Sequence, residues 1–505
     1  MQLRIGWGIR EISLEKPVSI PGQMYLRISE GILDPLYATA LCLDGGEGSV
    51  IFCSCDLGNF NSGVLGDTLR RVAALRPEIP PDSVILNATH THTCCDTRDK
   101  PEKSPDGKTI YPSSEYRKFF VEQCAQAICE SWDTRAPGGI AYGYGYAVAA
   151  HSRRTVYFGD MSEIKNDPVA PNGRGVMYGG PNHPLFSHFE AGADAFVNLL
   201  YTVDESGNLT GIVVNVPCPS QLSEHFTKLS ADYWNEVREG VRREFGETVR
   251  VLPQCAAAGD LSPRILYYKA AQCRRMRLKY GLEYPPEAGF RDPNRVMGER
   301  YDLAERVCDA VREVWSWAKK DIKRDVPVSC RRIPAAVSAR TVTAEEKAWC
   351  EANIEKMRGR IPAEGCASPE EIREAVTHFA SVRARNENAI RQYETQKPGQ
   401  TYSAALYAVR VGETAFAFSP FELYMDYMHR LQARSPFVQT FVVQLAGDEY
   451  GGYLPTERGV ENKGYSASLF DNRVSPAGGQ EVVELTLAAL CALHDEAEEG
   501  GNCNG

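Results

Sequence analysis

Short strand-like apolar runs alternate with segments of helical spacing along the first part of the chain. Two β-rich runs around a Gly-rich turn at 39–58 predict a hairpin, and the apolar run at 83–93 predicts a strand that ends in polar residues. Apolar residues spaced three and four apart predict helices at 65–77 and 115–132. This mixture predicts an α/β fold with polar side chains collected at strand ends.

The character of the sequence changes twice, which divides the chain into three segments. Residues 1–263 continue the alternation, with further buried strands expected at 209–219 and 248–263. Residues 264–400 are rich in Arg, Glu, Ala and Lys at helical spacing, so we expect a mainly helical insertion. Strands return in 401–505 and a long helix closes this segment. We therefore expect 1–263 and 401–505 to form the two parts of one α/β domain.

Charge and composition exclude several classes of function. The net charge of -10 argues against nucleic acid as a partner, because a surface that follows phosphates needs a basic excess. The chain has no apolar run long enough for a membrane span and no secretory signal at its start. Its 16 cysteines are too sparse for a disulfide scaffold. We expect a cytoplasmic protein with a small-molecule ligand, and nothing in the sequence sets the number of subunits.

The most suggestive polar segment is His-Thr-His, which ends the predicted strand at 83–93. In an extended segment residues i and i+2 point the same way, so His90 and His92 can bind one metal ion from one side. Such a pair also occurs at strand ends without any ion. The segment is therefore a candidate metal site that needs support from elsewhere in the chain.

Three further polar segments follow predicted strands. Asp260 and Ser262 lie in a Gly-Asp-Leu-Ser-Pro turn, where they serve either chemistry or simple turn formation. Glu422 lies at a strand-to-helix junction, where it is either a ligand or a charge at a helix start. Tyr450 and Tyr453 lie among glycines, in a loop suited to approach a site closely or to pack.

Taken in order, these segments resemble the neutral/alkaline non-lysosomal ceramidase family. NATHTHT is similar to the ATHTHS zinc motif of that family, GDLSPR to its GDxSPN hexapeptide, FSPFE to its strand-end PGE, and YGGYLPTE to its Y-x-x-Y-x-T-x-E stretch. The similarity spans roughly residues 3–475 and is weakest in 264–400. The resemblance implies a mixed-sheet α/β catalytic core with a helical insertion and one Zn²⁺ per chain.

The resemblance also implies roles for individual residues. As metal ligands it implies His90, His92, Glu422 and Tyr453. As catalytic residues it implies Tyr465, Arg153, Ser262 and Asp260. Two histidines and a glutamate leave zinc an open position for water, while Tyr465 and Arg153 are placed to stabilise an oxyanion.

The sequence departs from the family pattern at four places. Where the family has a third histidine before a proline, this chain has Cys218, which can replace it as a thiolate ligand unless Glu224 or His225 reaches the metal instead. Arg264 ends the hexapeptide in place of asparagine, and CCDT follows the histidines. The fourth departure is that the C-terminal β-sandwich expected of a secreted ceramidase is absent. We expect Cys94, Cys95, Arg264, Tyr450 and His225 to face the substrate.

These departures favour a small soluble substrate over ceramide itself. The leading hypothesis is a zinc-dependent hydrolase that cleaves an amide or ester bond. One alternative keeps the metal but makes the enzyme a lyase or isomerase acting on a sugar-like or hydroxy-carbonyl substrate. Another is a non-catalytic zinc- or ligand-binding protein, with Cys218 as the mark of a lost site.

Overall fold

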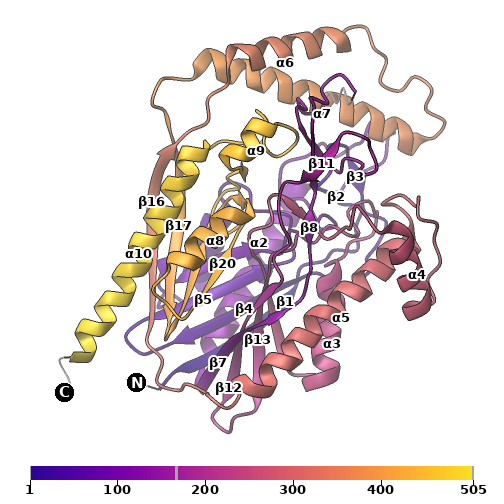
Figure 1. Ribbon diagram of the computed structural model, residues 1–505. Helices are drawn as coiled ribbons and strands as arrows, with labels where there is room; N and C mark the ends of the chain where they lie inside the picture. Colours follow the sequence, from indigo (N-terminus) through magenta and orange to yellow (C-terminus); the bar gives the residue numbers. More distant parts are fainter. Residues whose placement is uncertain (1, 165–168, 503–505) are drawn as a thin grey trace.

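The computed structural model describes residues 2–164 and 169–502 and shows four layers, with two sheets stacked between two layers of helices (Figure 1). Within these residues the larger sheet has eight strands in the order β14-β13-β12-β7-β1-β4-β5-β6. Neighbours are antiparallel except for the outermost pairs, β13/β14 and β5/β6. The strands are β1 (Arg4–Glu11), β4 (Tyr37–Asp44), β5 (Ser49–Cys55), β6 (Val84–Ala88), β7 (Ala136–Tyr146), β12 (Phe196–Asp204), β13 (Leu209–Val216) and β14 (Arg250–Cys255).

The larger sheet bends between β1 and β7. Arg4 pairs with Pro137 and one further pair follows, after which the two strands part within the described chain. The far edge of one half then lies against the other half, because Ser54 and Asn87 donate side-chain hydrogen bonds of 2.5 and 3.2 Å to the carbonyl of Pro253 on β14. The bend brings together the loops that follow β6, β13 and β14.

A second sheet packs against one face of the first. In the described chain it has four strands in the order β16-β17-β18-β20. Apolar side chains from both sheets form one buried cluster between them. Strands such as β5 are buried on both faces for this reason, and they read as continuous apolar runs. The strands are β16 (Val328–Ser338), β17 (Thr401–Val411), β18 (Thr414–Phe418) and β20 (Gln439–Val443).

Helices cover the outer face of each sheet. On the larger sheet these are α1 (Val64–Leu75), α2 (Ser113–Asp133), α3 (Tyr233–Phe245) and α5 (Pro293–Ala318). On the smaller sheet they are α8 (Met425–Arg434) and α10 (Pro476–Asn502), as Figure 1 shows. No helix in the described chain is long and apolar enough to cross a membrane.

The segment 264–400 contains a strand as well as helices. Besides α5, it contributes β16 to the smaller sheet, together with α4 (Lys269–Tyr280), α6 (Ala344–Met357) and α7 (Pro369–Thr395). The last two lie side by side above one end of the sheets (Figure 1). Helix α7 starts where Ser368 accepts a hydrogen bond from the backbone N–H of Glu371, with proline in the first turn.

Short elements complete the loops around the ends of the sheets. They are η1 (Pro81–Ser83), β2 (Ser19–Ile20), β3 (Arg27–Ile28), β8 (His151–Ser152), β9 (Arg154–Tyr157), β10 (Gly175–Met177), β11 (Phe186–Phe189), β15 (Leu261–Ser262), β19 (Glu422–Leu423), β21 (Tyr453–Leu454) and α9 (Glu457–Asn462).

Candidate metal centre and cleft

The His-Thr-His segment lies in a turn beyond the end of β6. The strand stops at Ala88, and His90 has a φ of 63°, in the left-handed region that few residues other than glycine adopt. The alternation expected of a strand therefore does not hold here. The two imidazole rings are perpendicular, with centroids 4.9 Å apart. His90 and His92 consequently have different surroundings.

His90 uses one ring nitrogen to fix its orientation and leaves the other free. Its Nδ1 lies 2.7 Å from the carbonyl oxygen of Gly58, which can only accept, so the proton is on Nδ1. Its buried Nε2 lies 3.2 Å from Glu422 Oε2 and has no hydrogen-bond partner. Two ligands of one tetrahedral zinc ion lie roughly 3.3 Å apart when each bond is about 2 Å long. The separation in this pair suits a shared ion.

Glu422 is held in the pair from two sides. Its Oε1 accepts a hydrogen bond of 2.7 Å from the Tyr450 hydroxyl. Its strand β19 runs parallel to β21, with Glu422 opposite Tyr453. Burial alone would raise the pKa of this carboxyl, but His90 and Arg153 outweigh it and lower the pKa to about 2. Glu422 is thus a buried carboxylate that attracts a cation.

His92 lies between two polar side chains, and only one of its ring nitrogens has a hydrogen bond. Its Nε2 lies 3.0 Å from Gln221 Nε2, and its Nδ1 lies 3.3 Å from Glu224 Oε2. Gly22, with a φ of 95°, lies directly against the ring, since a Cβ there would come within 2.6 Å of it. Burial chiefly lowers the pKa of His92, which favours the neutral ring. In this arrangement His92, like His90, has one buried ring nitrogen beside a carboxylate and without a hydrogen-bond partner, and it lines a cavity.

Arg264 positions Glu224 beside His92. The guanidinium forms an ion pair with Glu224 and donates to the carbonyls of Gln221 and Leu222, the latter at 3.1 Å. Burial would raise the pKa of Glu224, but Arg264 and His92 outweigh it and lower the pKa far below its usual range. The Arg264 side chain is buried and lies behind this loop. We had expected it to face the substrate, and the structure gives it a positioning role.

Cys218 does not approach the histidines. Its buried thiol donates to the carbonyls of Ala149 and Pro219, 3.4 and 3.6 Å away, and the side chain belongs to the apolar core. Burial raises the pKa of this thiol well above its usual value. The hypothesis that Cys218 replaces the third histidine does not fit this position. Of the residues weighed for that place, Glu224 is the one beside a motif histidine.

Arg153 and two tyrosines form a third group of predicted residues that the structure brings together. The rings of Tyr453 and Tyr465 lie 5.8 Å apart, and the Arg153 guanidinium lies 5.2 and 5.8 Å from their centroids. Arg153 Nη2 donates a 2.7 Å hydrogen bond to the Gly259 carbonyl, while its buried Nε has no partner. A fixed cation beside two phenols can stabilise a developing negative charge.

Asp260 and Ser262 support the site from behind it. Asp260 Oδ1 accepts a 3.1 Å hydrogen bond from the backbone N–H of Met425 at the start of α8, and burial raises its pKa to about 6. Ser262 Oγ accepts a 3.2 Å hydrogen bond from the hydroxyl of Tyr178. Neither side chain lines the cavities described next. Their position favours turn formation over direct chemistry.

Two cavities meet at His92. One, of about 220 Å³, lies on the His90 side and is lined by Glu422 and by three residues expected to face the substrate, namely Cys94, Cys95 and Tyr450. The other, of about 310 Å³, lies on the Arg153 side and is lined by His225, whose Nδ1 is 3.1 Å from the Tyr25 hydroxyl. His92, Tyr453 and Tyr465 line both. A ligand can therefore extend to either side of the tyrosines.

Helix α7 contributes residues that the sequence did not identify. Arg385 lines the smaller cavity, with its guanidinium 2.6 Å from Asp471 and 6.0 Å from the Tyr465 ring centroid. His378 lines the larger cavity together with Tyr178. The positive φ angles of Ser466 and Asp471, 70° and 60°, mark this loop as unusual, and they are not visible in the sequence. No motif in the sequence indicates that Arg385 on α7 lies near Tyr465, which is 80 residues farther along the chain.

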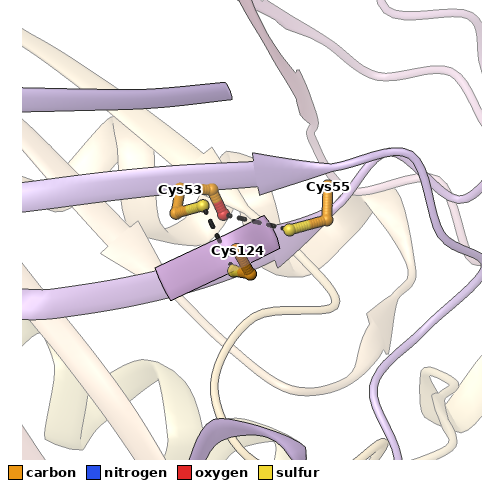
Figure 2. Close-up of side chains that lie close together, drawn as sticks. All are labelled: Cys53, Cys55 and Cys124. Carbon is orange, nitrogen blue, oxygen red and sulfur yellow. Dashed lines mark hydrogen bonds between the residues drawn. The ribbon is translucent and has the colours of Figure 1, made fainter. Parts of the chain in front are cut away.

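A separate cluster of thiols lies inside the core. Cys53 and Cys55 project from one face of β5 toward Cys124 on α2, with 3.6 Å between the sulfurs of Cys53 and Cys124 (Figure 2). These three are the only His, Cys, Asp or Glu donors of the described chain that come within 4.8 Å of one another as a trio. On donor geometry alone, they could hold a metal ion.

The His90 side fits a zinc ion in its chemistry. An unpartnered imidazole nitrogen and a carboxylate are donors that zinc accepts, and the backbone of Tyr453 lies opposite Glu422 in register. Gly58 supplies the carbonyl that orients metal-binding histidines. Within the described residues no third histidine, cysteine or carboxylate joins this pair with all separations under 4.8 Å. His92 and Glu224 therefore form a second pair beside the first.

Comparisons with known proteins bear on the fold. No protein-family model matches the sequence. No curated protein matches it either. Among solved structures, the neutral ceramidase from Pseudomonas aeruginosa is similar with a TM-score of 0.66 and 17% identity, over 98% of this chain and 75% of that one. A ceramidase complexed with C2 gives 0.65 and 16% identity, over 98% and 76%. Over nearly its whole length, this chain has the mixed α/β fold of the neutral ceramidases.

Proposed function

We propose that the chain is a zinc-dependent hydrolase that cleaves an amide or ester bond in a small polar substrate. The observation that carries this proposal is the buried pair of His90 Nε2 and Glu422 Oε2, 3.2 Å apart, with the nitrogen unpartnered and facing a cavity. Imidazole with carboxylate is a donor set of catalytic zinc sites. The fold of proteins named ceramidases supports the same class of reaction.

His90, Glu422 and Tyr453 are the residues that would hold the zinc, and the bound ion supplies a Lewis acid for a carbonyl group and for water. Gly58 keeps the proton of His90 on Nδ1, so Nε2 keeps its lone pair. Tyr450 holds Glu422 by one oxygen and leaves the other toward His90.

The cavity on the Arg153 side would bind the reacting part of the substrate. Arg153 and Tyr465 line the cavity on the far side of Tyr453 and present a cation and a hydroxyl to it. Donors fixed in this way stabilise the negative charge that develops on a carbonyl oxygen during hydrolysis. The two cavities, of about 220 and 310 Å³, suit a substrate of modest size better than a lipid with two long chains.

The test combines metal content with turnover. We expect elemental analysis of protein purified without chelator to give one zinc per chain. We expect the same protein to hydrolyse members of a panel of small N-acyl compounds and esters, and to lose this activity on dialysis against a chelator and regain it with zinc. Protein without a transition metal, or metal-loaded protein that hydrolyses no member of the panel, would count against the proposal.

A further inference from the structure

A third cavity adjoins the smaller cavity, the one that His90 lines. Most of the charged side chains in this third cavity are cationic. It has a volume of about 510 Å³ and shares Gln23, Asp96 and Arg98 with the cavity of His90. Lys100 and Lys103 also line it. We call Asp96, Arg98, Lys100 and Lys103 the cationic vestibule. It holds three cations and one carboxylate in a chain whose net charge is -10.

Asp96 is already satisfied within this group. The backbone N–H, Nε and Nη2 of Arg98 all donate to its carboxylate, at 2.9, 3.0 and 2.9 Å. Lys100 lies farther away, with Nζ 3.7 Å from Asp96 Oδ2. Lys103 is exposed and has no ion pair within the described chain. With one carboxylate for three cations, the vestibule has a formal excess of two positive charges.

From this arrangement we infer that the substrate carries an anionic group, a carboxylate or a phosphate, which binds the two lysines in the vestibule. The inference rests on the proposed hydrolase function, because it states which chemical group the substrate carries at the end that lies away from the His90–Glu422 pair. Ser19 and Ser381 also line this cavity and add hydroxyl groups suited to an oxyanion, whereas the Thr377 hydroxyl already donates to the Arg373 carbonyl. Among the described residues, the opposite cavity has no lysine in its lining; Arg153 and aromatic residues such as Tyr178 and Phe290 line it instead.

Calorimetric titration of the full-length protein with succinate, and with neutral succinamide as its counterpart, tests this inference. We expect succinate to bind and succinamide not to bind. Exposed lysines contribute modestly, so we expect the double variant Lys100→Gln/Lys103→Gln to raise the Kd for succinate by about fivefold to tenfold. Added salt should weaken the binding to wild-type protein. Titration with inorganic phosphate then shows which oxyanion the vestibule prefers.

Lys108→Gln is the matched control. This lysine lies in the same loop, faces Glu30 at 3.5 Å and lines none of these cavities, so its loss should leave the Kd within about twofold. Succinate binding that the double variant does not weaken, or equal binding of succinamide, would overturn the inference. Binding that behaves as expected in a protein that hydrolyses neither amides nor esters supports the vestibule and removes the proposed reaction alone.

Discussion

Two groups of metal-type donors in the described chain, the thiol trio and the His90–Glu422 pair, differ in charge and in access to a cavity. Cys53, Cys55 and Cys124 are the larger group, but they lie in an apolar core and line no cavity described above. Burial raises the pKa of the Cys55 thiol well above its usual value. His90 and Glu422 are only a pair, yet they face a cavity and carry an unpartnered nitrogen beside a carboxylate.

The difference shows that closeness of donors is a poor guide to a working metal site. Three thiols must lose their protons to bind zinc, and the core offers no charge to compensate the thiolates. The Glu422 carboxylate is already ionised. Burial would lower the pKa of His90, but Glu422 outweighs it and raises the pKa, so the imidazole has at most one proton to lose. The imidazole already has its proton placed on the far nitrogen by Gly58. Orientation, charge and access therefore favour the pair over the trio.

The largest expected effect comes from removing the pair. We expect His90→Ala or Glu422→Gln to lose the bound zinc and to lower kcat/KM at least about a thousandfold, because several kcal/mol of stabilisation from the ion disappear. Elemental analysis and turnover on the same preparation measure both. Cys124→Ala, measured in parallel, should keep its zinc. If zinc stays after either substitution at the pair and is lost after Cys124→Ala, the thiol cluster and not the His90–Glu422 pair is the zinc site.

The next effect separates chemistry from metal binding. Tyr465→Phe removes one hydroxyl beside Arg153 and changes no donor of the pair. We expect zinc to stay at the wild-type level while kcat falls about 10²–10³-fold, the usual scale for one oxyanion donor. An unchanged kcat on a verified substrate would take Tyr465 out of the reaction.

A smaller effect distinguishes the two histidines. His92→Gln keeps a side-chain N–H that can reach Glu224, and it leaves His90 and Glu422 in place. We expect zinc to be retained and kcat/KM to fall by about 10- to 100-fold, as for residues that support a metal site from outside. Loss of zinc equal to that in His90→Ala would show that both histidines are ligands.

The smallest effect concerns the thiol cluster. We expect Cys124→Ala to lower the free energy of unfolding by about 1–2 kcal/mol through lost packing, with full zinc content and unchanged turnover. Urea denaturation measures the stability. Cys491→Ala is the matched control, since this cysteine is exposed on α10 and its loss should change stability by less than about 0.5 kcal/mol. A drop in zinc or turnover would give the cluster a functional role.

The sequence predicted the parts of the candidate site that lie in short local motifs, and their roles stay predictions. Glu422 and Tyr453 stand in short motifs, and strands β19 and β21 place them opposite each other. The fold class was predicted and is confirmed by the structure and by its likeness to the neutral ceramidases. The fold class could be predicted because strands such as β5 are buried on both faces, so they stand out in the sequence as continuous apolar runs.

The rest depends on contacts between distant segments. The strand rule failed at His90 because its backbone turns into the left-handed region, and Cys218 points into the core. Arg264 is bound to Glu224, 40 residues earlier, which a single sequence does not reveal. The approach of α7 with Arg385 over the cavity is set by tertiary packing alone.

The bend in the larger sheet has a consequence for how the protein folds. His90 and Glu422 are 332 residues apart in the chain, and Arg153 and Tyr465 are 312 apart. They meet only when the two halves of the sheet and the smaller sheet have closed around one core. Contacts between such distant residues form slowly, because the chain between them must lose its freedom first. Metal affinity should therefore appear late in refolding, after most secondary structure has returned.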